Sequence, residues 1–128
     1  MKGADTAWRT AKGQYYEGLA LTYLRAHGLR LLQRNYRCKL GEIDLIMQDH
    51  GVLVFVEVRF RDSESHGTAF ETVDSRKQRK LLRAAQHYLL HHNEHVQRIC
   101  RFDVLGLSGR LHSFRIHWIR DAFGQAAD

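Results

Sequence analysis

The chain has 128 residues, of which 20 are Lys or Arg and 14 are Asp or Glu, giving a formal net charge of +6 at pH 7. This length suits one domain with a single core and excludes two. Hydrophobic residues make up 44% and charged residues 27%, which is typical of a globular protein and not of a disordered one. The positive charge favours a polyanionic partner such as nucleic acid, because phosphate contacts release condensed counterions.

Membrane and disulfide signals are missing from the sequence. No apolar run approaches the length of a membrane span, and the first dozen residues contain no hydrophobic leader. Cys38 and Cys100 match no zinc or redox spacing. We therefore expect a cytoplasmic protein with free thiols and no membrane contact.

The N-terminal third of the chain predicts a helix and a strand. Residues 1–12 are expected to form a flexible lead-in. From Gly13 to about His27, apolar residues recur at helical spacing, and Gly28 is the natural stop of that helix. Residues 29–37 fit neither the helical nor the strand period well, and we interpret them as a short edge strand.

The centre of the chain predicts a hairpin followed by a long helix. Residues 42–48 and 52–60 are rich in β-branched and aromatic residues, and Asp49-His50-Gly51 lies between them. Residues 61–72 form a polar loop and a candidate mobile flap. Residues 73–93 have the apolar spacing of the longest helix.

A second pair of strands completes the predicted domain. Residues 100–107 and 112–119 alternate between apolar and polar side chains around Ser108-Gly109-Arg110, and residues 122–128 are expected to form a flexible tail. The element order αβββαββ predicts an α/β fold with a central mixed five-stranded sheet flanked by helices. A single domain over residues 13–121 follows.

Two acids lie opposite each other in the predicted hairpin. If the chain turns on His50-Gly51 so that Asp49 faces Val52, then Asp44 faces Glu57, and on the same register Glu42 faces Arg59. Opposed like charges are destabilising unless a shared proton, a flanking cation or a metal ion offsets them. With the carbonyl of Val58 nearby, the two carboxylates suit Mg²⁺ or Mn²⁺. The alternative is that both acids lie on a solvent-exposed face without function.

An ordered set of motifs resembles a known family. Residues 13–17 (GQYYE), 35–37 (NYR), 41–46 (GEIDLI), 53–58 (LVFVEV) and 101–104 (RFDV) look like the YraN-like family of small bacterial proteins. That pattern is in turn similar to the PD-(D/E)xK nucleases, notably the archaeal Holliday-junction resolvases. The resemblance implies a restriction-endonuclease-like fold and a metal-dependent nuclease that hydrolyses phosphodiester bonds in DNA, structured or branched DNA included.

The resemblance assigns roles to particular residues. It implies metal-binding acids at Asp44 and Glu57 and a third, helix-borne acid at Glu17. On the sequence alone, Glu17 is equally well explained as a solvated first-turn glutamate. The pattern has a lysine two residues after the second acid, where this chain has Arg59. Arginine supplies charge and positioning but is hardly a base, so Arg59 weakens catalysis, redirects it or marks a domain that binds without cutting.

Basic residues cluster at the start of the predicted long helix. These residues are candidates for phosphate contacts, and Arg61, at the end of the preceding strand, extends the cluster. The full set comprises Arg61, Arg76, Lys77, Arg79, Lys80 and Arg83. A solvated helix face is the alternative explanation.

Three functions remain open at this point: a metal-dependent nuclease, a non-catalytic nucleic-acid-binding module that retains the fold, and a protein-interaction factor. The resolvase resemblance also makes a symmetric homodimer a hypothesis.

Overall fold

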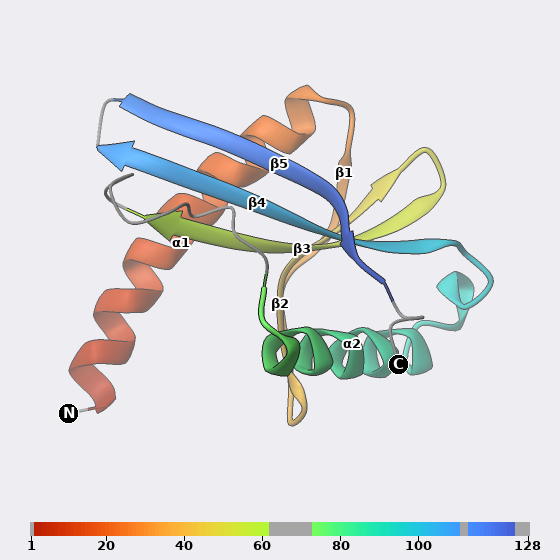
Figure 1. Cartoon of the computed structure of the whole chain (residues 1–128). Coiled ribbons are helices and arrows are strands. Elements are labelled where there is room, and N and C mark those ends of the chain that lie inside the picture. The colour runs from red at the N-terminus through yellow and green to blue at the C-terminus, as the bar shows by residue number, and fades with distance from the viewer. Residues whose placement is uncertain (1, 62–72, 111–112, 125–128) are drawn as a thin grey trace.

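The computed structural model describes residues 2–61, 73–110 and 113–124. In these ranges a five-stranded sheet lies between two α-helices (Figure 1). The elements are α1 (Lys2–Ala26), β1 (Arg30–Cys38), β2 (Gly41–Asp49), β3 (Val52–Arg61), α2 (Ser75–Leu90), the 3₁₀ turn η1 (Asn93–His95), β4 (Cys100–Arg110) and β5 (Ser113–Phe123). The predicted order αβββαββ is confirmed, and it is consistent with a restriction-endonuclease-like fold.

The sheet is mixed, and its spatial order follows the chain. The strands lie in the order β1-β2-β3-β4-β5, so β1 is an edge strand as predicted. The β1–β2, β2–β3 and β4–β5 pairs are antiparallel, whereas β3 and β4 are parallel. A parallel pair needs a crossover connection, and α2 lies within it. This crossover carries α2 across one face of the sheet.

The β2–β3 hairpin has the predicted register. Asp49 pairs with Val52, and the pairing continues as far as Leu45 with Val56. Both turn residues have positive φ, 53° at His50 and 99° at Gly51. Two such residues match the twist of the flanking strands, which is why a two-residue turn forms here.

Each face of the sheet carries its own hydrophobic core. Phe55, Phe102 and Tyr88 belong to the core between the sheet and α2. Leu24 and Leu45 belong to the core between the sheet and α1. Because side chains alternate along a strand, β2 and β3 contribute to both cores. The helix on each face that the sequence predicted is thus present.

Three predicted boundaries are wrong. α1 begins at Lys2, so residues 2–12 are helical, and Gly13 lies inside the helix. Alanines at positions 4, 7 and 11 favour a helix, and one internal glycine costs only about 1 kcal/mol. Ser108-Gly109-Arg110 belongs to β4 and pairs with β5, because the strands extend further than their alternation suggested. β5 likewise continues to Phe123, into the predicted tail.

The predicted flap, residues 61–72, falls outside the described residues except for Arg61, which ends β3. Among the described residues, neither helix combines the length and the apolar character that a membrane crossing requires.

Candidate functional site

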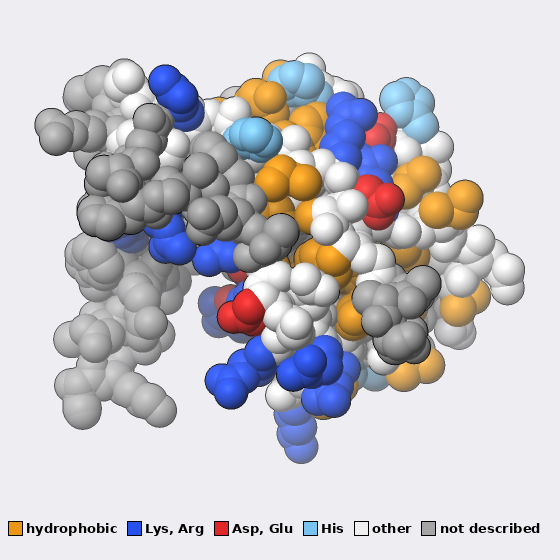
Figure 2. All heavy atoms as spheres, in the orientation of Figure 1, with side chains coloured by type: hydrophobic (Ala, Val, Ile, Leu, Met, Phe, Trp, Pro, Cys, Tyr) orange, Lys and Arg blue, Asp and Glu red, His pale blue; other side chains and the backbone are white. Residues whose placement is uncertain are grey.

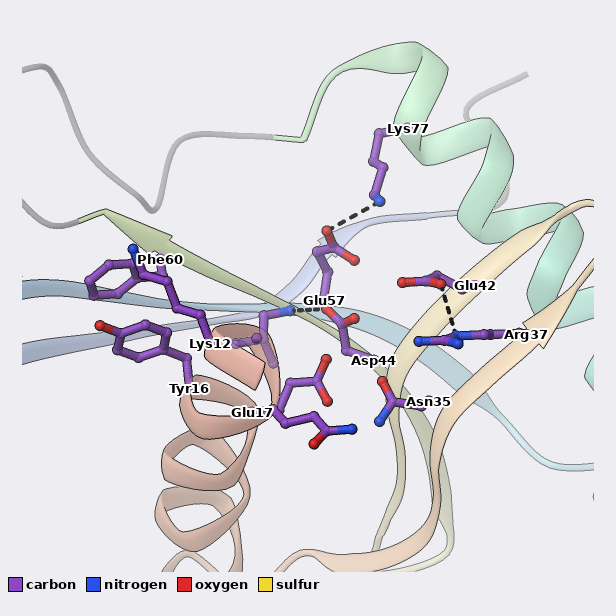
Figure 3. Close-up of a pocket in the computed structure, with 13 residues that line it drawn as sticks. Lys12, Tyr16, Glu17, Asn35, Arg37, Glu42, Asp44, Glu57, Phe60 and Lys77 are labelled. Carbon is purple, nitrogen blue, oxygen red and sulfur yellow. Dashed lines mark hydrogen bonds and ion pairs between the residues drawn. The ribbon is translucent and has the colours of Figure 1, made fainter. Parts of the chain in front are cut away.

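A pocket of about 740 Å³ opens where α1, β1, β2, β3 and the start of α2 meet (Figure 3). Its lining includes three acids from three different elements: Glu17 of α1, Asp44 of β2 and Glu57 of β3. Val58 and Lys77 also line it. The structure therefore brings together five residues that the sequence analysis singled out, and we call this cavity the acidic pocket.

The acidic pocket lies where the β2–β3 ladder ends. Beyond the Leu45–Val56 pair, the backbone N–H of Val58 donates to Oδ2 of Asp44 at 2.8 Å. The Asp44 side chain thus occupies a position that a backbone carbonyl holds in a regular ladder. The predicted strand pairing of Asp44 with Glu57 is not among the ladder pairs, and the two acids meet through their side chains instead.

Glu42 also differs from its predicted place. The extended register put it opposite Arg59, but it pairs instead with Arg37 of β1, Oε1 to Nε at 3.3 Å. The physical reason is that the Asp44 side chain accepts the Val58 N–H, so the β2–β3 pairing ends before it reaches Glu42.

Lys77 of α2 reaches Glu57 across the acidic pocket. Its Nζ lies 3.5 Å from Oε2 of Glu57, whose side chain is only 13% exposed. The start of α2 is held in place by Asp74, whose Oδ1 accepts the backbone N–H of Lys77 at 2.9 Å. This N-cap fixes the first helical turn and therefore the direction in which Lys77 extends.

Glu17 presents a buried oxygen without a hydrogen bond. Its side chain is 12% exposed, and its nearest ion-pair partner, Nε of Arg34, is 3.6 Å from Oε1. Within the described residues, neither of these two atoms has a hydrogen-bond partner. A buried carboxylate oxygen left in this way costs free energy unless a ligand or water completes it. Glu17 is therefore not the solvated glutamate of the alternative explanation.

Burial raises the pKa values of the two central acids, and the charge of one of them acts on the other. The pKa of Asp44 lies well above its usual range because of burial and then of the negative charge of Glu57, against which the Val58 N–H acts. Burial also raises the pKa of Glu57, opposed mainly by Lys77 and further by Arg59 and a hydrogen bond with Asp44. Of the three compensations considered from sequence, the structure contains the flanking cation, which is Lys77.

These residues fit a hydrated hard cation better than a closed metal cage. Among the described residues, no three of His, Cys, Asp and Glu form a ready cluster of metal ligands. Mg²⁺ commonly uses one or two carboxylates and keeps several waters. Asp44 and Glu57 meet that requirement, and the unbonded Glu17 oxygen, which lines the same pocket, would be an acceptor for a water on such an ion.

The other predicted residues lie around the acidic pocket and not in it. Arg59 lines an adjoining hollow of about 290 Å³ together with Glu57 and Lys77. Basic side chains gather over the α2 region in Figure 2. Four exposed α2 residues of the predicted basic cluster lie outside the acidic pocket: Arg76, Arg79, Lys80 and Arg83. Arg61, at the end of β3, is also exposed.

Asn35 and Arg37 line the acidic pocket but were not assigned a role from the sequence. Their appearance in a family-like motif was the only signal. Asn35 has φ of 56°, a left-handed conformation that asparagine tolerates better than most residues. The periodicity of a strand does not predict a left-handed residue within it.

The element order and the five-stranded mixed sheet define an α/β protein, consistent with a restriction-endonuclease-like fold. The chain belongs to the family described as Uncharacterised protein family UPF0102, which matches residues 16–107. This agrees with the YraN-like motifs. It is 50% identical over 112 residues to a UPF0102 protein of Nitrosococcus oceani, covering 88% of this chain and 90% of the relative. A UPF0102 protein of Stutzerimonas stutzeri is 46% identical over 113 residues, covering 88% and 94% respectively.

The raised pKa values predict how pH affects stability without metal. A carboxyl whose pKa is higher in the folded state than in the unfolded chain stabilises the fold while it is protonated. That contribution is lost as pH rises through the folded-state pKa. Between the usual carboxyl range and the raised pKa of Asp44, we therefore expect the unfolding free energy of wild type to fall relative to that of Asp44→Asn.

Urea denaturation of both proteins in chelator, over a series of pH values, measures this difference. Comparing the two proteins cancels the opposite contribution of Asp49, whose pKa is lowered chiefly by its hydrogen bond with His50. Parallel curves for wild type and Asp44→Asn would show that Asp44 has no raised pKa.

Proposed function

We propose that this protein is a divalent-metal-dependent nuclease that hydrolyses phosphodiester bonds in DNA, structured or branched DNA included. The observation that carries the proposal is one pocket with Asp44, Glu57 and the unbonded Glu17 oxygen, bordered by Lys77 and other cations. Acids alone would repel a phosphate backbone. A divalent cation bound by the acids and by the phosphate together best explains a pocket of this composition.

The metal would be Mg²⁺ or Mn²⁺, held by Asp44 and Glu57 with the carbonyl of Val58 as a further candidate ligand. When bound, such an ion activates water and stabilises charge on the phosphate. Hydrogen bonds within the protein orient two of the residues around this site. The Val58 N–H orients the Asp44 carboxylate, and the N-cap of α2 orients Lys77.

The nuclease pattern has a lysine where this chain has Arg59, and we assign the role of that lysine to Lys77. It lines the acidic pocket, whereas Arg59 lines only the neighbouring hollow. An ammonium group at this position neutralises Glu57 when no metal is present, and it can turn toward phosphate oxygens when metal binds to Glu57. The sequence alone assigned Lys77 to phosphate contacts only.

We expect Lys77→Ala to lower the rate of metal-dependent cleavage by about 10²-fold, comparable to the loss of one charge-stabilising donor. Lys77→Arg should restore part of the loss, because it returns the charge. Single-turnover cleavage at saturating protein measures the effect separately from binding. Arg79→Ala is the matched control, since this exposed α2 residue lies outside the acidic pocket. Equal rates for Lys77→Ala and Arg79→Ala would contradict the assignment.

A non-catalytic nucleic-acid-binding module is the second candidate. The observation in its favour is the Lys77–Glu57 ion pair, which neutralises one of the two central acids without a metal. Arg59 in place of lysine points the same way.

Cleavage of a labelled substrate panel separates the two candidates. Duplex, flap, single-stranded and four-way-junction DNAs are incubated with wild type in Mg²⁺, in Mn²⁺ and in chelator. The nuclease proposal predicts cleavage of at least one substrate with metal and none in chelator. Binding that persists in chelator, without cleavage in any lane, would favour the binding module.

A further inference from the structure

A second hollow, of about 380 Å³, adjoins the acidic pocket on the side of the β1–β2 turn. Arg37, Lys77 and Glu42 line both cavities, and the second hollow adds Lys39 and Lys80. The lining of this hollow therefore contains four cations and one acid. The centre of the acidic pocket, in contrast, contains two acids, Asp44 and Glu57. We call the second cavity the basic hollow.

The walls of the basic hollow are held together by a close backbone approach. A Cβ added to Gly41 would lie 3.0 Å from the backbone oxygen of Lys80, so a side chain here would push the β1–β2 turn and α2 apart by a few tenths of an ångström. Leu81, the next residue of α2, is buried in the core and anchors the helix. The turn thus contributes Lys39 and the helix contributes Lys80 to the lining of the same hollow.

Two of the four cations are not engaged by acids. Arg37 pairs with Glu42, and Lys77 pairs with Glu57. In the ranges that the structure describes, Lys39 and Lys80 are both exposed and form no ion pair. Two such lysines in one concave site leave a net positive charge, which favours an anion small enough to contact both.

We propose that the basic hollow binds a phosphate group of the nucleic-acid strand, next to the phosphate in the acidic pocket. This inference rests on the proposed function and adds a direction to it: the strand leaves the acidic pocket over Lys77 toward the β1–β2 turn. The bound group is an internal phosphodiester or a terminal phosphate, which have the same tetrahedral anionic chemistry. Lys39 and Lys80 position the strand and do not touch the reacting atoms.

The double variant Lys39→Ala/Lys80→Ala tests the basic hollow. We expect its affinity for a labelled oligonucleotide, measured by fluorescence anisotropy, to fall by about tenfold or more, and the slope of log K against log salt to fall by about 2. Arg25→Ala/Arg30→Ala removes the same charge from two exposed positions, one in the last turn of α1 and one at the start of β1, and should match wild type within about twofold. In cleavage assays the increase in KM should exceed the decrease in kcat.

Oligonucleotides with a 5′-phosphate, a 3′-phosphate or neither distinguish the two phosphate sources. An equal loss for all three indicates an internal phosphodiester, and a loss confined to one of them indicates a terminal phosphate; both results uphold the site. Equal affinities for the double variant and the arginine control would overturn it, while cleavage by wild type would still uphold the nuclease. A wild type that neither binds nor cuts nucleic acid overturns both proposals.

Discussion

Asp44→Asn and Glu57→Gln are each expected to lower the rate of metal-dependent cleavage by about 10³-fold or more, as loss of a central catalytic group does. Both changes keep the size of the side chain and remove the negative charge that a divalent ion needs. In Asp44→Asn the Val58 N–H can still donate to the oxygen of the new side-chain amide, so the strand geometry should persist. Single-turnover rates on the best substrate of the panel measure the effect.

Glu42→Gln is the matched control for these two variants. Glu42 also lines the acidic pocket, but its side chain is 50% exposed and pairs with Arg37. We expect its rate to stay within about tenfold of wild type, because an exposed ion pair contributes little. A Glu57→Gln protein that folds normally and cuts at the rate of Glu42→Gln would exclude Glu57 from the reaction.

Asp103→Ala is expected to destabilise the protein by about 3–5 kcal/mol, the usual loss when one partner of a buried ion pair is removed. Asp103 is 1% exposed, and Nε of Arg101 donates to its Oδ1 at 3.0 Å. Asp103 also accepts from Nε1 of Trp118 and from the backbone N–H of Asp121, both at 2.9 Å. Alanine would leave all three donors without this acceptor, at the irregularity where β4 and β5 shift register.

Urea denaturation measures this loss, with Glu94→Ala as the control. Glu94 is 66% exposed and lies 3.8 Å from His95, so its removal should change stability by less than about 0.5 kcal/mol. The loss of stability in Asp103→Asn should lie between those in Asp103→Ala and Glu94→Ala, because the amide oxygen still accepts hydrogen bonds but carries no charge. A loss below about 1 kcal/mol for Asp103→Ala would contradict a structural role for the network.

Local sequence signals predicted the elements that depend on local physics. His50-Gly51 determines a two-residue turn, and the turn determines the register as far as Leu45 and Val56. Gly28, with φ of 95°, follows the end of α1 as expected. The alternation of Phe114, Ile116 and Trp118 correctly indicated the face of β5 that packs against the core.

The geometry of the site depends on contacts that no periodicity encodes. The hydrogen bond from Val58 to Asp44 replaces regular strand pairing, so the extension of the register beyond Leu45 was wrong. The approach of Lys77 to Glu57 requires α2 to cross the sheet at one position, which is set by core packing. The buried position of Glu17 likewise follows from how α1 packs, and its sequence neighbours do not reveal it.

A Mn²⁺ titration of wild type and Asp44→Asn, followed by the electron paramagnetic resonance signal of the free ion, tests whether the acidic pocket holds a divalent metal. Cleavage is proposed to depend on a cation that Asp44 and Glu57 hold together. We expect saturable Mn²⁺ binding to wild type, competition by Mg²⁺, and affinity at least about tenfold weaker for Asp44→Asn. Identical titrations of the two proteins, or no binding to wild type, would contradict a metal centre in the acidic pocket.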